Sequence, residues 1–202
     1  MIDACTLFKT VKKWFIIVAQ VKPFTTKIMA TSNKKLPAIF ISYAHKDNKS
    51  SDPARRWLER LQEQLEPLVQ EGEIAVCSDL DIELGDDWHK CIQKHLRAAH
   101  AAVLLVSPAF LASKYIRNSE LPVLLRNARD KGVKIIPIIL RPCLFVESKF
   151  KYPDPQTGPE EFPLASLQAA GSPAKALSEM TEGEQDRELL KVAQALAKLA
   201  NP

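Results

Sequence analysis

The chain has 202 residues, of which 46% are hydrophobic and 26% charged, and this composition excludes bulk disorder and collagen-like repeats. The formal net charge is +4, but residues 1–35 hold seven lysines and one acid, whereas residues 36–202 sum to −2. Nucleic-acid binding needs a basic face on the folded domain, so this distribution argues against a nucleic-acid partner. We therefore expect a basic leader, 1–35, followed by one nearly neutral domain, 36–202.

The leader contains a short apolar run, 14–19, behind Lys12 and Lys13. The run is too short for a confident membrane-spanning segment, and no clear small-x-small cleavage site follows it. Three interpretations stay open: an interfacial amphipathic helix, a weak export signal, or an upstream stretch that is not translated. We favour the third, with translation starting at Met29, and otherwise expect the leader to be disordered.

Four cysteines stand at positions 5, 77, 91 and 143, and none forms a C-x-x-C pair. Scattered thiols in a chain of this size are typical of a reduced, intracellular protein. Neither the cysteines nor the four histidines have the spacing of metal ligands. We therefore expect cysteines that serve packing, no metal site and a cytoplasmic location.

The domain begins with a β-branched and aromatic run at 38–43, which predicts a buried strand. A polar loop follows, and Ser51 or Asp52 is expected to cap a helix with Pro53 in its first turn. Apolar residues at helical spacing carry that helix to about residue 70, and Pro67 should end or kink its last turn.

The next segments alternate in the same way. The pattern predicts, in chain order, a strand at 74–77, a polar loop at 78–87, a helix at 88–99, a strand at 101–106, a helix from 108 to about 130, a strand at 133–140, a Pro-rich surface loop at 147–163 and a terminal helix at 182–199. Pro137 cannot donate to a β-ladder, so its strand should lie near a sheet edge or a bulge.

Repeated alternation of strand and helix predicts an α/β fold, with an open parallel sheet of four to five strands and helices on both faces. In such sheets the ligand crevice lies outside the carboxyl ends of the strands. The segments expected at those ends are 42–52, 78–87, 107–113 and 141–147, and the functional residues should be sought there.

Several common chemistries have no signal in the sequence. No G-x-G-x-x-G follows the first strand, and no Walker loop or G-x-S-x-G elbow is present. One carboxylate, Glu120, lies mid-helix two residues before Pro122, which perturbs the helix. Spacing alone favours a solvated Glu120, although the local break leaves open that it projects toward the crevice.

Five segments, taken in order, resemble those of bacterial Toll/interleukin-1 receptor (TIR) domains. They are the IFISYAHKD stretch at 39–47, the second strand and BB loop at 76–88, the VLLVSPAFLAS stretch at 103–113, the Glu120-Leu121-Pro122 run, and the fourth strand with its RPC turn at 135–143. A late segment around Phe162 and Leu167-Gln168 also fits the bacterial branch. The resemblance covers about residues 37–200.

The resemblance implies a flavodoxin-like fold and one of two functions. Some TIR domains are scaffolds that signal by TIR–TIR association, and others cleave NAD⁺ at the nicotinamide–ribose bond. In the enzymes a glutamate at the position of Glu120 is essential. A single carboxylate suffices there, because nicotinamide is already a cationic leaving group and the transition state resembles an oxocarbenium ion.

The remaining site residues are also implied by the resemblance. Tyr43, Ala44 and His45 would line the NAD⁺ site, with Ser42 near it, and Glu83 of the BB loop would contact the substrate. Many catalytic members carry an aromatic residue four positions before the glutamate, where this chain has Ile116 preceded by Tyr115.

The expected function is thus NAD⁺ hydrolysis or cyclisation, giving nicotinamide plus ADP-ribose or a cyclic isomer, in defence or signalling. NAD⁺ is then the substrate and no further cofactor is expected. Partners would be copies of the chain, meeting through surfaces that include the BB loop, 79–87. The alternative is a non-catalytic TIR adaptor.

Overall fold

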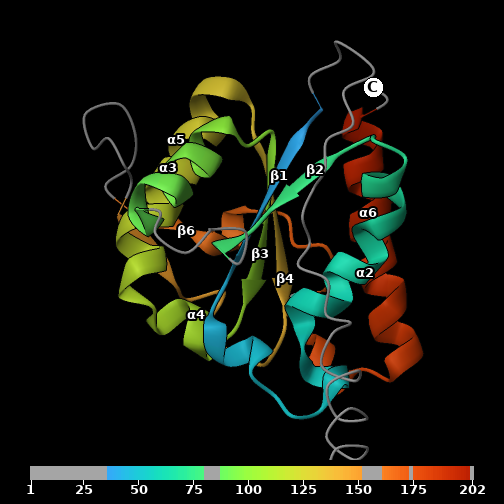
Figure 1. Cartoon of the computed structure of the whole chain (residues 1–202). Coiled ribbons are helices and arrows are strands. Elements are labelled where there is room, and N and C mark those ends of the chain that lie inside the picture. Colours follow the sequence, from blue (N-terminus) through green and yellow to red (C-terminus); the bar gives the residue numbers. More distant parts are fainter. Residues whose placement is uncertain (1–35, 80–86, 152–160, 173–174, 201–202) are drawn as a thin grey trace, which may run out of the picture. The chain divides into compact units, whose positions relative to one another are not determined.

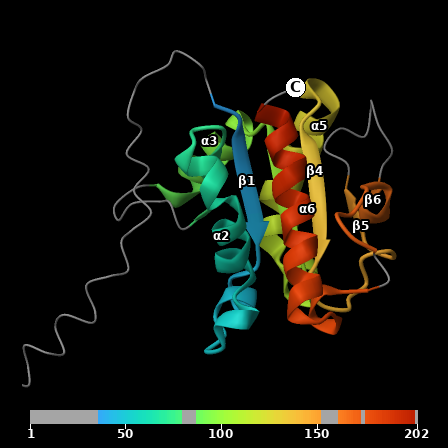
Figure 2. The same cartoon turned by 90° about the vertical axis from the view of Figure 1, so that its right-hand side faces the viewer.

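A computed structural model describes residues 36–79, 87–151, 161–172 and 175–200, all of which belong to the unit formed by residues 35–202. The expectations for residues 1–35, and those for the part of the BB loop at 80–86, lie outside the described residues. Figure 1 shows the described elements and Figure 2 shows them turned by 90°.

The sheet has the predicted architecture. Its strands are β1 (Ala38–Tyr43), β2 (Ala75–Cys77), β3 (Ala101–Val106) and β4 (Lys134–Ile139), and all adjacent pairs are parallel in the order β2-β1-β3-β4. The central strand β3 is buried at every position, as its continuous apolar sequence requires for a strand covered on both faces. This confirms the predicted α/β fold with a parallel sheet.

Helices cover both faces of this sheet (Figure 1). On one side lie α2 (Trp57–Gln70) and α6 (Glu182–Ala200), which contact each other and stand side by side in Figure 2. On the other side lie α3 (Trp88–Ala98), α4 (Pro108–Ala112) and α5 (Leu121–Lys131). No helix in the described part of the chain is both long and apolar enough to cross a membrane.

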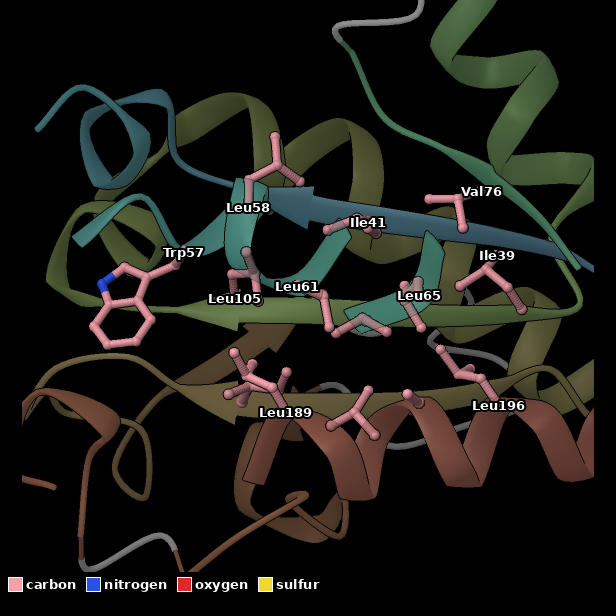
Figure 3. Close-up of a cluster of buried hydrophobic side chains, with 14 of the residues drawn as sticks. Ile39, Ile41, Trp57, Leu58, Leu61, Leu65, Val76, Leu105, Leu189 and Leu196 are labelled. Carbon is pink, nitrogen blue, oxygen red and sulfur yellow. The ribbon is translucent and has the colours of Figure 1, made fainter. Parts of the chain in front are cut away.

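Each face of the sheet has its own hydrophobic core, because successive strand residues point to opposite sides. On the α2/α6 side Ile39 and Ile41 of β1 meet the apolar stripe of α2 and, beyond it, Leu189 and Leu196 of α6 (Figure 3). On the other side Phe40 packs with Ile92 of α3, Leu124 of α5 and other buried residues. A fully buried aliphatic side chain contributes about 1.5–3 kcal/mol, so these two layers provide most of the driving force.

The start of α2 differs from the expectation. Asp52 does cap a turn, accepting a hydrogen bond from the backbone N–H of Ala54, but that turn is a separate 3₁₀ helix at Pro53–Arg55. The α-helix itself begins at Trp57 and continues past Pro67 to Gln70, where it ends within one turn of the proline.

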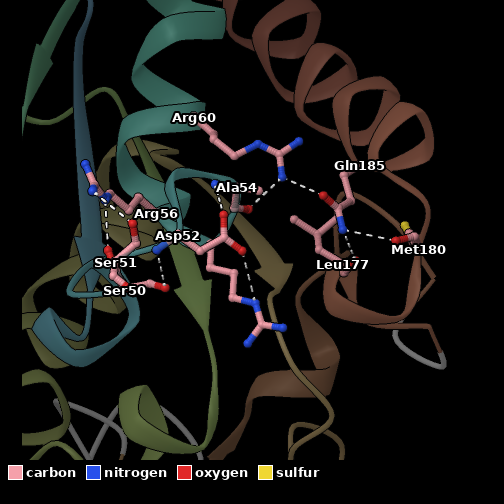
Figure 4. A network of polar contacts seen from close by, with 10 residues as sticks. Ser50, Ser51, Asp52, Ala54, Arg56, Arg60, Leu177, Met180 and Gln185 are labelled. Carbon is pink, nitrogen blue, oxygen red and sulfur yellow. Dashed lines mark hydrogen bonds and ion pairs between the residues drawn. The ribbon is translucent and has the colours of Figure 1, made fainter.

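Arg60 fastens α2 to the start of α6 (Figure 4). Its guanidinium donates to Gln185 Oε1 at 2.5 Å, Asp186 Oδ1 at 2.6 Å and the carbonyl of Ala54 at 3.1 Å. It also lies over the Trp57 ring, 5.2 Å from the centroid. With its side chain only 12% exposed, Arg60 is a largely buried cation with a full set of partners.

The predicted helix from 108 to about 130 is wrong as one element. The chain forms α4, an extended Ser113, a π-helical turn at Ile116–Glu120 and then α5. The Ser113 hydroxyl accepts from the backbone N–H of Ile116 at 3.4 Å, and such local side-chain bonds favour a break. The amide of Leu121 then bonds to the carbonyl of Ile116, the five-residue spacing of a π turn.

The predicted loop at 147–163 is wrong in part. Strands β5 (Lys149–Lys151) and β6 (Glu161–Pro163) pair antiparallel, with Phe150 opposite Phe162. Phe150 is buried, and the guanidinium of Arg117 lies 4.7 Å from its ring centroid. These aromatic contacts hold the two strands against the domain.

Pro137 lies in a strand at the edge of the sheet, one of the two positions predicted for it. β4 is an edge strand, where Pro137 stands opposite Leu104 and its carbonyl accepts a hydrogen bond from Ala170 at 2.9 Å. The cysteines at 77, 91 and 143 are partly buried thiols that form no disulfide with any described residue.

Candidate functional site

A pocket of about 420 Å³ opens where β1 ends, beside the end of β2 and the π turn. Its wall includes four of the five expected binding residues, and Glu120 stands among them. The lining residues are Phe40, Ile41, Ser42, Tyr43, Ala44, His45, Lys46, Asp79, Ala109, Ala112, Ser113, Tyr115, Ile116 and Glu120. In open parallel sheets, ligands bind in a crevice outside the carboxyl ends of the strands, which is the position of this pocket.

The strand pleat decides which residue of β1 faces Glu120. Ile41 and Tyr43 belong to the core beneath α2 and α6, whereas Phe40 belongs to the opposite core. Ser42 therefore points with Phe40 toward the side that carries the π turn. Ser42 is 2% exposed, and its hydroxyl donates a hydrogen bond to Glu120 Oε2.

The π turn presents Glu120 from the other wall. Glu120 is the last residue of the turn and immediately precedes α5, whose second residue is Pro122. Gln93 of α3 donates to the carbonyl of Ser119 at 3.1 Å and fixes the turn from outside. The extra residue of a π turn changes the direction in which the neighbouring side chains point. In this turn the side chain of Glu120 is directed inward and is only 6% exposed. Glu120 is thus not the solvated helix residue that spacing alone favoured.

The environment makes Glu120 easy to protonate near neutrality. Burial raises the pKa of Glu120 to about 7; the hydrogen bond from Ser42 and the nearby His45 oppose the rise, and the negative charge of Asp79 adds to it. A carboxyl group with a strongly raised pKa in a cleft is typical of a functional site.

Asp79 and His45 form a pair across the mouth of the pocket. His45 Nε2 is bonded to Asp79 Oδ2, with the His45 side chain 57% exposed and that of Asp79 11% exposed. The other carboxylate oxygen, Asp79 Oδ1, is buried and has no hydrogen-bond donor among the described residues. That oxygen is therefore available to a hydroxyl group of a ligand, because a buried acceptor without a donor is costly.

Aromatic rings flank the carboxylates. The Tyr43 and His45 rings lie 5.5 Å apart between centroids. Tyr115 meets His89 edge-on, and its hydroxyl lies 3.2 Å from His89 Nδ1. Burial raises the pKa of Tyr115 to about 12, with Glu120 and Asp79 adding to the rise, so the phenol stays protonated as a donor.

The structure thus brings Ser42, Tyr43, Ala44 and His45 together with Glu120. The fifth expected contact, Glu83, lies outside the described residues. Asp79, Lys46 and Tyr115 also line the pocket and were missed as site residues. Asp79 had a usable signal, because it lies two residues past the end of β2, and the ends of adjacent parallel strands meet at one edge.

Asp47, the aspartate of the IFISYAHKD stretch, is not among the residues that line this pocket. Asp47 is 9% exposed and accepts a hydrogen bond at 2.5 Å from the hydroxyl of Ser107, which follows β3. Burial raises the pKa of Asp47, against the hydrogen bond from Ser107 and the charge of Arg141. This bond ties the loop after β1 to the end of β3 and so holds the backbone that carries His45.

The fold and this pocket define a flavodoxin-like α/β domain with a buried carboxylate at the carboxyl edge of its sheet. Residues 39–169 match the model of the TIR domain family, and the chain belongs to that family. In the described part of the chain no group of three or more His, Cys, Asp or Glu side chains is arranged to hold a metal ion.

Known proteins similar to this chain include the following. The uncharacterized protein y4lF of Sinorhizobium fredii (strain NBRC 101917 / NGR234) is 33% identical over 108 residues, 54% of this chain. The match spans 31% of that relative's own length. A solved structure of TIR domains in the activated Roq1 resistosome, which directly recognizes the pathogen effector XopQ, matches with a TM-score of 0.42 at 17% identity, over 82% of this chain and 84% of the other.

Proposed function

We propose that this TIR domain cleaves NAD⁺ at the bond between nicotinamide and ribose, with Glu120 as the catalytic carboxylate. The observation that carries the proposal is the buried Glu120, hydrogen-bonded to Ser42 inside a pocket at the carboxyl edge of the sheet. The volume of this pocket, about 420 Å³, lies within the range of small-molecule sites, about 300–1,000 Å³.

The reaction needs little more than a well-placed negative charge. The bond between ribose C1′ and the pyridinium nitrogen breaks, and its electron pair returns to the ring, which leaves as neutral nicotinamide. The positive charge that develops at C1′ is stabilised by ionised Glu120 at short range in a site of low dielectric constant. Attack of water at C1′, with loss of a proton, gives ADP-ribose, whereas attack by a nucleophilic atom of the same molecule gives a cyclic isomer.

The neighbours of Glu120 supply position and orientation. Ser42 holds one carboxylate oxygen, which leaves the other to face the ribose. Asp79 Oδ1, buried and without a donor among the described residues, is suited to accept a hydrogen bond from a ribose hydroxyl. Tyr43, His45 and Tyr115 offer ring surfaces for the nicotinamide or adenine base, and Ala44 leaves room at the wall.

Four further proposals are supported by membership of the TIR family: a substrate contact, self-association, location and biological role. Glu83 is proposed as a further substrate contact from the BB loop, and copies of the chain are proposed to associate through surfaces that include residues 79–87. Activity in the cytoplasm, in defence or signalling, belongs to the same proposal.

The test is turnover of NAD⁺ at high protein concentration, with products identified by chromatography and mass spectrometry. Wild type should release nicotinamide, and Glu120→Ala and Glu120→Gln should lower the rate at least about 100-fold while remaining folded. Glu147→Gln, a change at an exposed glutamate outside the pocket, is the matched control and should retain activity. If concentrated wild type releases no nicotinamide, the adaptor interpretation replaces this proposal.

A further inference from the structure

The π turn that carries Glu120 is short of hydrogen bonds of its own. The amide of Leu121 reaches back five residues to the carbonyl of Ile116. Pro122 has no N–H, so the carbonyl of Asn118, four positions earlier, lacks the donor that a regular helix would give it. Backbone of an uncommon conformation persists where the surrounding structure holds it. The side chains that contact the turn therefore decide where Glu120 points.

Gln93 of α3 contacts this turn at both of its ends. Its carboxamide nitrogen donates to the carbonyl of Ser119 at 3.1 Å, and Ser119 directly precedes Glu120. The same side chain is hydrogen-bonded to Tyr115, the residue just before the turn. Burial raises the pKa of the Tyr115 phenol to about 12, and the bond from Gln93 opposes that rise, as expected of a donor. One neutral side chain thus links the start and the end of the turn.

Gln93 projects from a firmly placed helix. Its neighbour Ile92 and, one turn on, Leu96 are fully buried in the same hydrophobic core as Leu124 of α5. Asn127 of α5 donates a hydrogen bond to the carbonyl of Leu96 at 2.8 Å. These contacts fix α3 against α5 independently of the π turn. A group carried by a rigid element can define the position of a reactive side chain more closely than a loop can.

His89 supports the same arrangement from one turn earlier on α3. It lies four positions before Gln93, so the two side chains share a helix face. His89 Nδ1 lies 3.2 Å from the Tyr115 hydroxyl, and the two rings meet edge-on. Tyr115 is therefore held by α3 at two points while its ring lines the pocket. A displacement of Gln93 would move both this wall and the carboxylate.

We infer that Gln93 is a positioning residue of the proposed active site, which acts through Ser119 and Tyr115 to hold Glu120 toward the ribose. Gln93 itself is not among the residues that line the pocket, so it has no direct contact with substrate there. The inference rests on the proposed function of Glu120. Misplacement of a catalytic group by about 1 Å can cost about 100-fold in rate, so a single outside contact matters.

Removing the donor tests this role. Gln93→Leu keeps a side chain of similar size without a hydrogen-bonding group, and it should lower kcat for NAD⁺ at least about tenfold. The rate is measured at pH 9, where Glu120 with its pKa of about 7 is ionised. Gln93→Lys, which retains donors on a flexible stem, should recover most of the loss. Gln64→Leu, at a glutamine of α2 that is half-buried as Gln93 is, should keep the wild-type kcat.

A second measurement does not need turnover. Carbon-13 NMR of the side-chain carboxyl, assigned with Glu120→Gln, follows the titration of Glu120 directly. Burial raises this pKa to about 7 in wild type, so a carboxylate released from its inward position in Gln93→Leu should titrate closer to 4.5. The titratable groups that face Glu120, namely His45, Asp79 and Tyr115, are unchanged in the variant. A glutamine that merely stabilised the fold would leave the pKa of Glu120 where it is.

The two measurements separate this inference from the proposed function. A wild-type kcat together with an unchanged pKa of Glu120 in Gln93→Leu overturns the positioning role and leaves NAD⁺ cleavage standing. Wild type that releases no nicotinamide overturns the proposed function, and the titration still decides whether Gln93 places Glu120. If Gln93→Leu does not fold, Gln93→Glu takes its place, because its ionised carboxylate keeps the shape but cannot donate. An unchanged kcat in Gln93→Glu at pH 9 then overturns the inference.

Discussion

Ser42 and Glu120 are separated by 78 residues, yet the hydroxyl of Ser42 donates a hydrogen bond to Glu120 Oε2 inside the protein. One residue comes from the buried end of β1 and the other from a π turn before α5. The contact holds the carboxylate in place and lowers its pKa, against the larger effect of burial. The proposed chemistry depends on this balance, because only the ionised carboxylate stabilises positive charge at C1′.

Replacing Glu120 by Gln should abolish NAD⁺ cleavage and stabilise the fold above neutral pH. The native pKa of about 7 lies above the ordinary 4.5, so wild type loses stability as the pH rises from about 4.5 through 7. For a group that is 6% exposed, this difference costs wild type up to about 3 kcal/mol at pH 8. Urea unfolding at pH 8 should show the gain in Glu120→Gln, and at pH 4.5 most of the gain should disappear. An equal stability difference at both pH values would contradict the raised pKa.

Replacing Ser42 by Ala should move the pH dependence of turnover upward. Without the hydroxyl donor, the pKa of Glu120 rises further, and less of the carboxylate is ionised at neutral pH. We expect kcat/KM to fall several-fold at pH 7 and to recover in part at pH 9, measured as a full pH–rate profile. Ser42→Thr keeps a hydroxyl and serves as the comparison. A profile that drops uniformly at every pH would indicate a lost substrate contact instead.

Replacing Asp79 by Asn should shift the same profile in the opposite direction. Removing the negative charge lowers the pKa of Glu120, since Asp79 is one of the groups that raise it. The midpoint of the acidic limb should therefore move to lower pH. If Asp79 Oδ1 also accepts a hydrogen bond from a ribose hydroxyl, the plateau of kcat/KM should fall about tenfold or more. An unchanged midpoint would show that Asp79 does not act on Glu120.

Replacing Ser107 by Ala should destabilise the domain. The hydroxyl donates to buried Asp47 at 2.5 Å and also caps α4, accepting from the backbone N–H of Phe110 at 3.0 Å. Loss of a cap and of a donor to a buried carboxylate costs about 1–3 kcal/mol in total. Denaturant unfolding at pH 7 measures it, and Ser166→Ala, at an exposed serine, is the control. A change below about 0.5 kcal/mol would mean that Asp47 finds another donor.

Replacing Arg60 by Ala should loosen the packing of α2 on α6. The largely buried guanidinium donates to Gln185 and to the carbonyl of Ala54 (Figure 4), and also to Asp186, so its loss leaves these acceptors without that donor. We expect a loss of about 1–3 kcal/mol in the free energy of unfolding. Arg55→Ala, at an arginine whose side chain is 76% exposed, should cost less than about 0.5 kcal/mol. Equal effects of the two changes would contradict a specific role for Arg60.

The sequence by itself determined the arrangement of elements. Continuous apolar runs at β1 and β3, and helical spacing in α2 and α6, encode burial directly, so the parallel sheet and its two helical layers were predictable. The edge position of Pro137 followed from its missing N–H, and the order of short motifs placed the chain in its family. These features depend on residues close together in the chain.

The tertiary structure decided the properties of the site. The burial of Glu120 depends on a π turn that helical spacing does not reveal. That burial raises the pKa of Glu120, Asp79 adds to the rise, and Ser42 and His45 oppose it, so the pKa depends on residues from two different strand ends. Burial and electrostatics depend on distances in space, and local sequence patterns do not determine those distances.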